Sequence, residues 1–135
     1  MLPLVLASSS DYRRELLQRL KLPFICSSPE IDEQAHQGET PMQLVRRLAE
    51  EKARAVRDNF PQHLIIGSDQ VAVLGDEILG KPHDMQRATA QLQAASGRSV
   101  SFLTGLTLLN SQTGHCQVDC VSFTVHFREL DDQQI

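Results

Sequence analysis

The chain has 135 residues, of which 41% are hydrophobic and 22% are charged, so its composition is that of a folded globular protein. The net charge of −4 argues against a general nucleic-acid-binding protein, because such proteins usually carry a basic excess. The sequence has no apolar stretch near the roughly 20 residues that a membrane span requires, and its N-terminus lacks the basic flank of a secretory signal.

The three cysteines are Cys26, Cys116 and Cys120, an odd number without the paired spacing of a zinc site. We therefore expect reduced thiols in a cytoplasmic protein. The lack of a long apolar stretch predicts that it has no membrane partner. The length suits one domain that spans residues 1–135.

The chain begins with an apolar strand and a helix. Residues 2–7 are predicted to form the strand, which leads directly into Ser8-Ser9-Ser10. A helix is predicted to begin near Asp11, with Ser10 as its cap, because the leucines at positions 16, 17 and 20 share one helical face.

The next segments are a strand, a loop and a second helix. Residues 21–27 are predicted to form a short strand, and the polar residues 28–39 a long loop, a kind of segment that is more often functional than idle. Thr40 and Gln43 have the spacing of a capping box, so a helix is predicted to follow and to run to about Asn59.

Residues 63–74 have the pattern of a buried strand, apart from Asp69. Gly75-Asp76 predicts a turn that returns the chain through residues 77–79 as a hairpin. Asp69 is a carboxylate among apolar neighbours, where an unpaired charge is costly. Such a group is kept when it is paired, binds a metal or acts as a base. The alternative is a structural Asp that caps a turn at Gly67-Ser68.

The last third of the chain is predicted to contain a helix and two strands. Asp84 is expected to cap a helix that ends at Gly97, followed by strands over residues 100–109 and 116–128. The apolar alternation of the last strand slips by one residue, which predicts a β-bulge near Cys120-Val121.

These elements predict an α/β fold with a mixed, partly antiparallel sheet and flanking helices. The residues from Asp131 to Gln134 have the form of a cap for a further helix. We therefore expect the domain to be incomplete at its C-terminus.

The serine loop and the helix start after it form a candidate phosphate site. Free backbone N–H groups and the positive end of the helix dipole favour an anion there. Ser8 and Ser10 supply hydroxyls for phosphate oxygens, and Arg13 and Arg14 supply guanidinium groups. The alternative is a solvated helix start, since this pattern alone is a moderate signal.

Three further charged residues stand in unusual settings. Lys52 falls in the apolar stripe of its helix, where a lysine either extends to an edge or reaches a buried anion. Lys81 lies between Gly80 and Pro82, which fix its direction after the hairpin. Glu33 lies on the long polar loop and, with Asp69, would hold a Mg²⁺ or Mn²⁺ ion. A solvated acidic residue is the simpler interpretation of Glu33.

Together and in this order, these pieces resemble the Maf family of nucleoside triphosphate pyrophosphatases. The matching segments are Leu6-Ala-Ser-Ser-Ser-x-x-Arg-Arg14, Asp32-Glu33, Leu48-Ala-x-Glu-Lys-Ala53, Gly67-Ser-Asp-Gln-Val71, Gly80-Lys-Pro82, Ser96-Gly97 and Thr104-Gly105. The resemblance implies the fold of inosine triphosphate pyrophosphatases, which is an elongated α/β domain with a central cleft and is commonly dimeric. It also implies Asp69 as the general base, basic residues such as Lys52 and Lys81 around the triphosphate, and a divalent cation.

Residues 63–71 and 125–130 are similar to the branch of this family that hydrolyses 7-methyl-GTP. Position 12 is aromatic in that branch and is Tyr12 here, and a cationic methylated guanine stacks well on an aromatic ring. Gln70 has an amide that can read a base edge. The resemblance therefore implies hydrolysis of 7-methyl-GTP to 7-methyl-GMP and pyrophosphate. The alternatives are a dTTP or UTP pyrophosphatase and a non-catalytic nucleotide-binding regulator of cell division.

Overall fold

The computed structural model describes residues 2–75, 77–79, 90–91, 93 and 96–126. It divides into two compact units, one formed by Met1–Asp69 with Thr104–Val121 and the other by Gln70–Leu103 with Ser122–Ile135. The predicted cap near residue 131 lies outside the described residues, as does most of the predicted helix after Asp84. The single domain over residues 1–135 stays a prediction, as does the central cleft.

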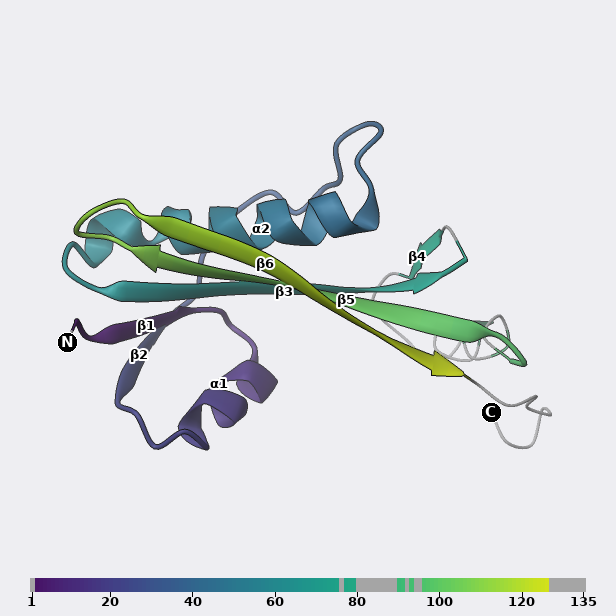
Figure 1. Ribbon diagram of the computed structural model, residues 1–135, viewed down its shortest axis with the longest axis horizontal. Helices are drawn as coiled ribbons and strands as arrows, with labels where there is room; N and C mark the ends of the chain where they lie inside the picture. The colour runs from purple at the N-terminus through teal and green to yellow at the C-terminus, as the bar shows by residue number, and fades with distance from the viewer. Residues whose placement is uncertain (1, 76, 80–89, 92, 94–95, 127–135) are drawn as a thin grey trace. The chain divides into compact units, whose positions relative to one another are not determined.

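The strands are β1 Leu4–Ala7, β2 Phe24–Ser27, β3 Leu64–Leu74, β4 Glu77–Leu79, β5 Ser99–Asn110 and β6 Cys116–His126. They form a mixed sheet (Figure 1) with the order β2-β1-β3-β5-β6, and β4 pairs with β3. Strand β1 pairs in parallel with both β2 and β3, whereas β3 and β4 are antiparallel. The helices are α1 Asp11–Gln18, α2 Pro41–Ala55 and the short 3₁₀ helix η1 Arg57–Asn59. This architecture confirms the predicted mixed α/β fold.

Helix α1 begins where the sequence predicts. Ser10 is its N-cap, and the Ser10 side chain accepts a hydrogen bond of 3.3 Å from the backbone N–H of Arg13. The predicted leucine face is wrong in part, because Leu16 and Leu20 are 40% and 62% exposed. Leu20 also lies beyond the helix, which ends at Gln18.

Strand β2 is shorter than the sequence predicts. It begins at Phe24 instead of residue 21. Lys21 has a φ of 58°, a left-handed conformation that a non-glycine residue rarely adopts and that an extended strand does not contain. The chain therefore completes a turn after α1 before it enters the sheet.

Helix α2 has the predicted capping box. The Thr40 side chain accepts from the Gln43 backbone N–H at 3.2 Å, and the Gln43 side chain accepts from the Thr40 N–H at 2.9 Å. Two helix-end donors are thus satisfied reciprocally. The predicted end near Asn59 is wrong by one turn, because the regular helix stops at Ala55 and η1 follows it.

Helix α2 lies against the sheet through two glycines of the first unit. A Cβ atom on Gly67 of β3 would lie 2.1 Å from the carbonyl oxygen of Ala49, and one on Gly105 of β5 would lie 2.1 Å from that of Val45. No side chain fits in such a space, so the helix backbone contacts the sheet directly. This contact sets the distance between α2 and β3.

The core of the first unit is apolar and lies between α2 and the sheet. Its buried members are Val5, Ala7, Ala53, Val56, Ile65 and Leu109, with Phe60 and Cys116 packed against them. Burial raises the pKa of the Cys116 thiol, and Cys26, Cys116 and Cys120 are all free thiols. None of the helices in the described residues is long and apolar enough to cross a membrane.

The second unit contains the predicted hairpin. Val73 of β3 pairs with Ile78 of β4, and Gly75 has a φ of 63°, as a tight hairpin turn requires. Its core consists of Leu74 and Val100, with Ala72, Leu79 and Phe102 packed against them.

The β-bulge predicted near Cys120-Val121 is wrong. The hydrogen bond from Asn110 to His115, the ring stacking of Phe102 on Phe123 at 5.1 Å and the contact of Ser101 with Thr124 at 3.0 Å all belong to one pairing register. A bulge would add one residue to one strand and shift the register. Every residue of β6 from Val121 to His126 is exposed. The apolar alternation in this part of the strand therefore does not reflect burial, and its slip by one residue does not mark a bulge.

Candidate active site

The carboxyl end of β1 brings the serine loop close to Asp69 of the neighbouring strand β3. Ala7 of β1 pairs with Gly67 of β3 in parallel register, so Ser8 leaves the sheet beside the Ser68-Asp69 segment. Ligands of α/β proteins typically bind outside the carboxyl ends of parallel strands. The first unit therefore places the predicted phosphate loop and the predicted base in one region.

The serine hydroxyls are held by backbone donors. Ser8 is 7% exposed, and its hydroxyl accepts from the Ser10 N–H at 3.0 Å. The Ser10 hydroxyl accepts from the Arg13 N–H at 3.3 Å. A hydroxyl that accepts with a lone pair keeps its proton for donation, so both serines are suited to an anionic acceptor such as a phosphate oxygen. Arg13 is half-buried and Arg14 is exposed on the first turn of α1.

Asp69 lies in the middle of β3 and not in a turn, so the alternative of a turn-capping Asp is wrong. Residues two apart on a strand share a face, and Gly67 faces α2, so Asp69 also points to the α2 side of the sheet. Its side chain is 12% exposed. The carboxylate is thus withdrawn from water on the face that carries the helix.

Lys52 reaches this carboxylate from the apolar stripe of α2. Its Nζ lies 2.9 Å from Asp69 Oδ1 and 2.9 Å from Glu33 Oε1, and its side chain is 13% exposed. Of the two alternatives for Lys52, the structure shows the buried anion and not the solvent edge. Glu33 likewise has a charged partner and is not simply solvated.

This cluster of one ammonium and two carboxylates carries a formal excess of one negative charge. Two carboxylates suit Mg²⁺ or Mn²⁺, because these ions often bind through one or two protein carboxylates and take their other oxygens from water and phosphate. Within the described residues, no group of three or more His, Cys, Asp or Glu side chains could hold a metal. Glu33 and Asp69 therefore fit an ion that shares its coordination with a phosphorylated ligand.

A second ion-pair network anchors the loop that carries Glu33, and the sequence alone did not indicate it. Arg47 on α2 donates through Nε to Glu39 Oε2 at 2.7 Å and through its terminal nitrogens to Glu39 Oε1 and Glu51 Oε2, each at 3.0 Å. The Arg47 guanidinium and the His36 backbone N–H lower the pKa of Glu39 to about 2. The hydrogen bonds that Arg47 donates to the Glu39 carboxylate in turn raise the pKa of Arg47. The available signal was the four-residue spacing of Arg47 and Glu51.

For three predicted site residues the structure gives no test of a place in this cluster. Lys81 and the side chain of Tyr12 lie outside the described residues. Gln70 follows Asp69 on β3, is exposed and belongs to the second unit. The roles predicted for these three residues stay predictions.

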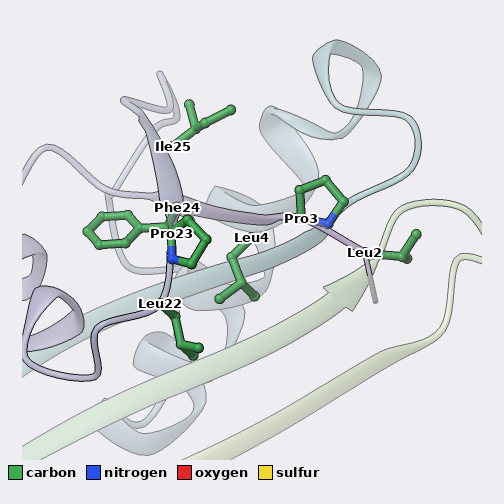
Figure 2. A pocket seen from close by; sticks show the side chains of 7 residues that line it. All are labelled: Leu2, Pro3, Leu4, Leu22, Pro23, Phe24 and Ile25. Carbon is green, nitrogen blue, oxygen red and sulfur yellow. The ribbon is translucent and has the colours of Figure 1, made fainter.

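An apolar cavity of about 430 Å³ lies at the opposite end of the short parallel strands (Figure 2). It is lined by Leu2, Pro3, Leu4, Leu22, Pro23, Phe24 and Ile25. These residues precede or begin β1 and β2, whereas the serine loop follows the end of β1. The lining offers no side-chain donor for a phosphate and no carboxylate for a metal, so this cavity is not the candidate active site.

Comparison with known proteins agrees with this geometry. A family model described as Maf-like protein matches residues 3–135. A protein of Pseudomonas fluorescens named 7-methyl-GTP pyrophosphatase is 69% identical over 135 residues, which are 100% of this chain and 70% of that protein. Proteins with the same name from Pseudomonas aeruginosa and Alcanivorax borkumensis are 62% and 60% identical, each over 98% of this chain and over 69% and 67% of their own lengths.

A solved structure supports the fold independently. The Ham1 protein of Staphylococcus aureus superposes with a TM-score of 0.62 at 13% identity, over 92% of this chain and 71% of that one. This likeness confirms the fold implied by the resemblance. The family model matches nearly the whole chain, and the Pseudomonas fluorescens relative is 69% identical over all of it. Together these matches show that the chain belongs to the Maf-like protein family.

Proposed function

We propose that this protein hydrolyses 7-methyl-GTP to 7-methyl-GMP and pyrophosphate. The observation that carries the proposal is the Lys52 ammonium between the carboxylates of Asp69 and Glu33, next to a serine loop suited to phosphate. The names of relatives that are 60% to 69% identical support the choice of nucleotide.

In the proposed reaction, water attacks the α-phosphorus, the bond from the α-phosphorus to the bridging oxygen breaks, and pyrophosphate leaves. Asp69 takes the proton of the attacking water. Lys52 binds Asp69 through Oδ1 at 2.9 Å, so we assign the proton to Oδ2. The Lys52 ammonium compensates the negative charge of this buried carboxylate, which is the proton acceptor of the proposed step.

The remaining residues bind the substrate and its charge. Four residues at the start of α1 are assigned to the phosphates, because hydroxyl and guanidinium groups are suited to phosphate oxygens. They are Ser8 and Ser10 before the helix and Arg13 and Arg14 in its first turn. Lys81 is assigned to the negative charge of the phosphates because of its place between Gly80 and Pro82 in the sequence.

A Mg²⁺ or Mn²⁺ ion would be held by Glu33 and Asp69 and would neutralise negative charge on the phosphates when bound.

Tyr12 and Gln70 are assigned to the selection of the nucleobase. The site of action is the cytoplasm, and the protein acts as a homodimer.

The test is pyrophosphate release from a panel of 7-methyl-GTP, GTP, dTTP and UTP with added Mg²⁺ or Mn²⁺. The Pseudomonas fluorescens relative serves as the positive control. We expect 7-methyl-GTP to be the preferred substrate. A preference for dTTP or UTP would assign the protein to the pyrimidine branch. Nucleotide binding without release, while the control is active, would support a non-catalytic regulator.

A further inference from the structure

Arg47 connects helix α2 to both ends of a loop segment. Its forked guanidinium holds Glu39, at the end of the segment, through two bonds of 2.7 and 3.0 Å. A terminal nitrogen also donates to the backbone carbonyl of Gln34, at the start of the segment, at 3.0 Å. One side chain therefore fixes two points of the chain that are five residues apart in sequence.

The segment is also closed on itself. The His36 N–H donates to Glu39 Oε1, and the Glu39 N–H donates to the His36 carbonyl, each at 3.0 Å. The carboxylate of Glu39 thus binds the guanidinium and its own loop at the same time. Loss of Arg47 would leave these bonds exposed to water without an anchor on the helix.

Glu33 immediately precedes the anchored segment. The Gln34 N–H donates to Asp32 Oδ1 at 3.0 Å, so a local turn surrounds Glu33 and limits its backbone. Glu33 is 57% exposed in its side chain and makes its ion pair with Lys52, five residues after Arg47 on α2. The position of Glu33 therefore depends on where the loop is fixed to the helix.

We infer that Arg47 is a positioning residue that holds Glu33 over Lys52 by anchoring the Gln34–Glu39 segment to α2. It does not contact the proposed substrate. The consequence for catalysis rests on the proposed function, but the effect on the loop and on Lys52 does not.

The competing explanation is that Arg47 only stabilises the helix through its pair with Glu51. The chain offers a matched control for this explanation. Arg54 and Glu50 form a pair of the same four-residue spacing on the same helix, with Nε and Oε2 2.7 Å apart. Among the described residues, Arg54 interacts with Glu50 and Cys116, and neither belongs to the loop.

The experiment compares Arg47→Met, Arg47→Lys and Arg54→Met with the wild-type protein, without metal or nucleotide. Amide hydrogen exchange reports the segment from Gln34 to Glu39, and the NMR signal of the Lys52 side-chain ammonium reports its ion pair. Glu33→Gln gives the reference signal for a Lys52 that has lost Glu33.

We expect Arg47→Met to speed exchange of the His36 and Glu39 amides by roughly tenfold or more, the effect of losing a charged hydrogen bond. It should also move the Lys52 signal toward that of Glu33→Gln. Arg54→Met should do neither. Arg47→Lys should recover only part of the protection, because one ammonium cannot span Glu39 and the Gln34 carbonyl.

Equal effects of Arg47→Met and Arg54→Met, or a Lys52 signal unchanged in Arg47→Met, would overturn the inference. Full recovery in Arg47→Lys would overturn the requirement for a forked donor. If the wild-type protein releases no pyrophosphate, the proposed function fails, whereas exchange and the Lys52 signal still decide the role of Arg47.

Discussion

Lys52 and Asp69 are 17 positions apart in sequence, and their charged atoms lie 2.9 Å apart in the structure. The contact joins α2 to the middle of β3, two elements that also touch at Gly67. Their side chains are 13% and 12% exposed, so the Asp69 carboxylate depends on the Lys52 ammonium for charge compensation.

Asp69→Asn should abolish hydrolysis while the protein stays folded. The amide is nearly isosteric but cannot accept the proton of water, and loss of a general base costs about 10²–10⁴-fold in rate. Pyrophosphate release measures the rate, and circular dichroism checks the fold. Turnover near that of the wild type would remove Asp69 from the role of base.

Lys52→Met should lower the free energy of unfolding at neutral pH by about 1–3 kcal/mol, because it leaves the buried Asp69 carboxylate without its partner. Lys52→Met combined with Asp69→Asn should recover most of that loss. Denaturant unfolding of both single variants and the double variant gives the coupling energy. Additive losses in the double variant would show that the pair does not stabilise the fold.

Gly67→Ala should destabilise the first unit by about 3 kcal/mol, at the upper end of typical overpacking costs. Its Cβ would lie 2.1 Å from the Ala49 carbonyl oxygen, so α2 has to move. Gly38→Ala is the control, since a Cβ there meets no atom within 4 Å although its φ is 76°. We expect the control to cost only about 1–2 kcal/mol for the left-handed backbone. A Gly67→Ala protein as stable as the control would contradict the direct helix–sheet contact.

The order of the Glu33 loop should depend on acid pH through Glu39. Its pKa is lowered from 4.5 to about 2, so its contribution is complete above 4.5 and is lost as the pH falls toward about 2. Limited proteolysis by an acid-stable protease, or hydrogen exchange corrected for pH, should show the loop opening in that window. Glu39→Gln should open the loop already at neutral pH and remove the dependence. If the loop of the Glu39→Gln variant still opens over the same acid pH range, the pH dependence belongs to another group.

Local signals in the sequence predicted the first unit well. The capping box at Thr40 and Gln43, the cap at Ser10 and the buried strand around Asp69 depend on neighbours in sequence, and the structure has all three. The approach of Lys52 to Asp69 was one of two alternatives, because a lysine in an apolar stripe has two ways to satisfy its charge.

Features that depend on tertiary contacts could not be read from the sequence. The anchoring of Arg47 to the Gln34 carbonyl involves a backbone atom, which has no residue type to recognise. The exposure of Leu16 and the single register of β6 show the same limit. An apolar pattern predicts which residues can be buried, and only the arrangement of neighbouring elements decides which of them are.

The contact of α2 with Gly67 and Gly105 also bears on how this helix can be redesigned. At these two glycines the helix backbone lies directly against the sheet, so no change of side-chain size at these points can alter the separation of helix and sheet. A helix transplanted from a relative would keep Lys52 within reach of Asp69 provided that it retains small residues at Ala49 and Ala53. Library design on the solvent side of α2 is then free to change composition, whereas the two glycines belong among the fixed positions.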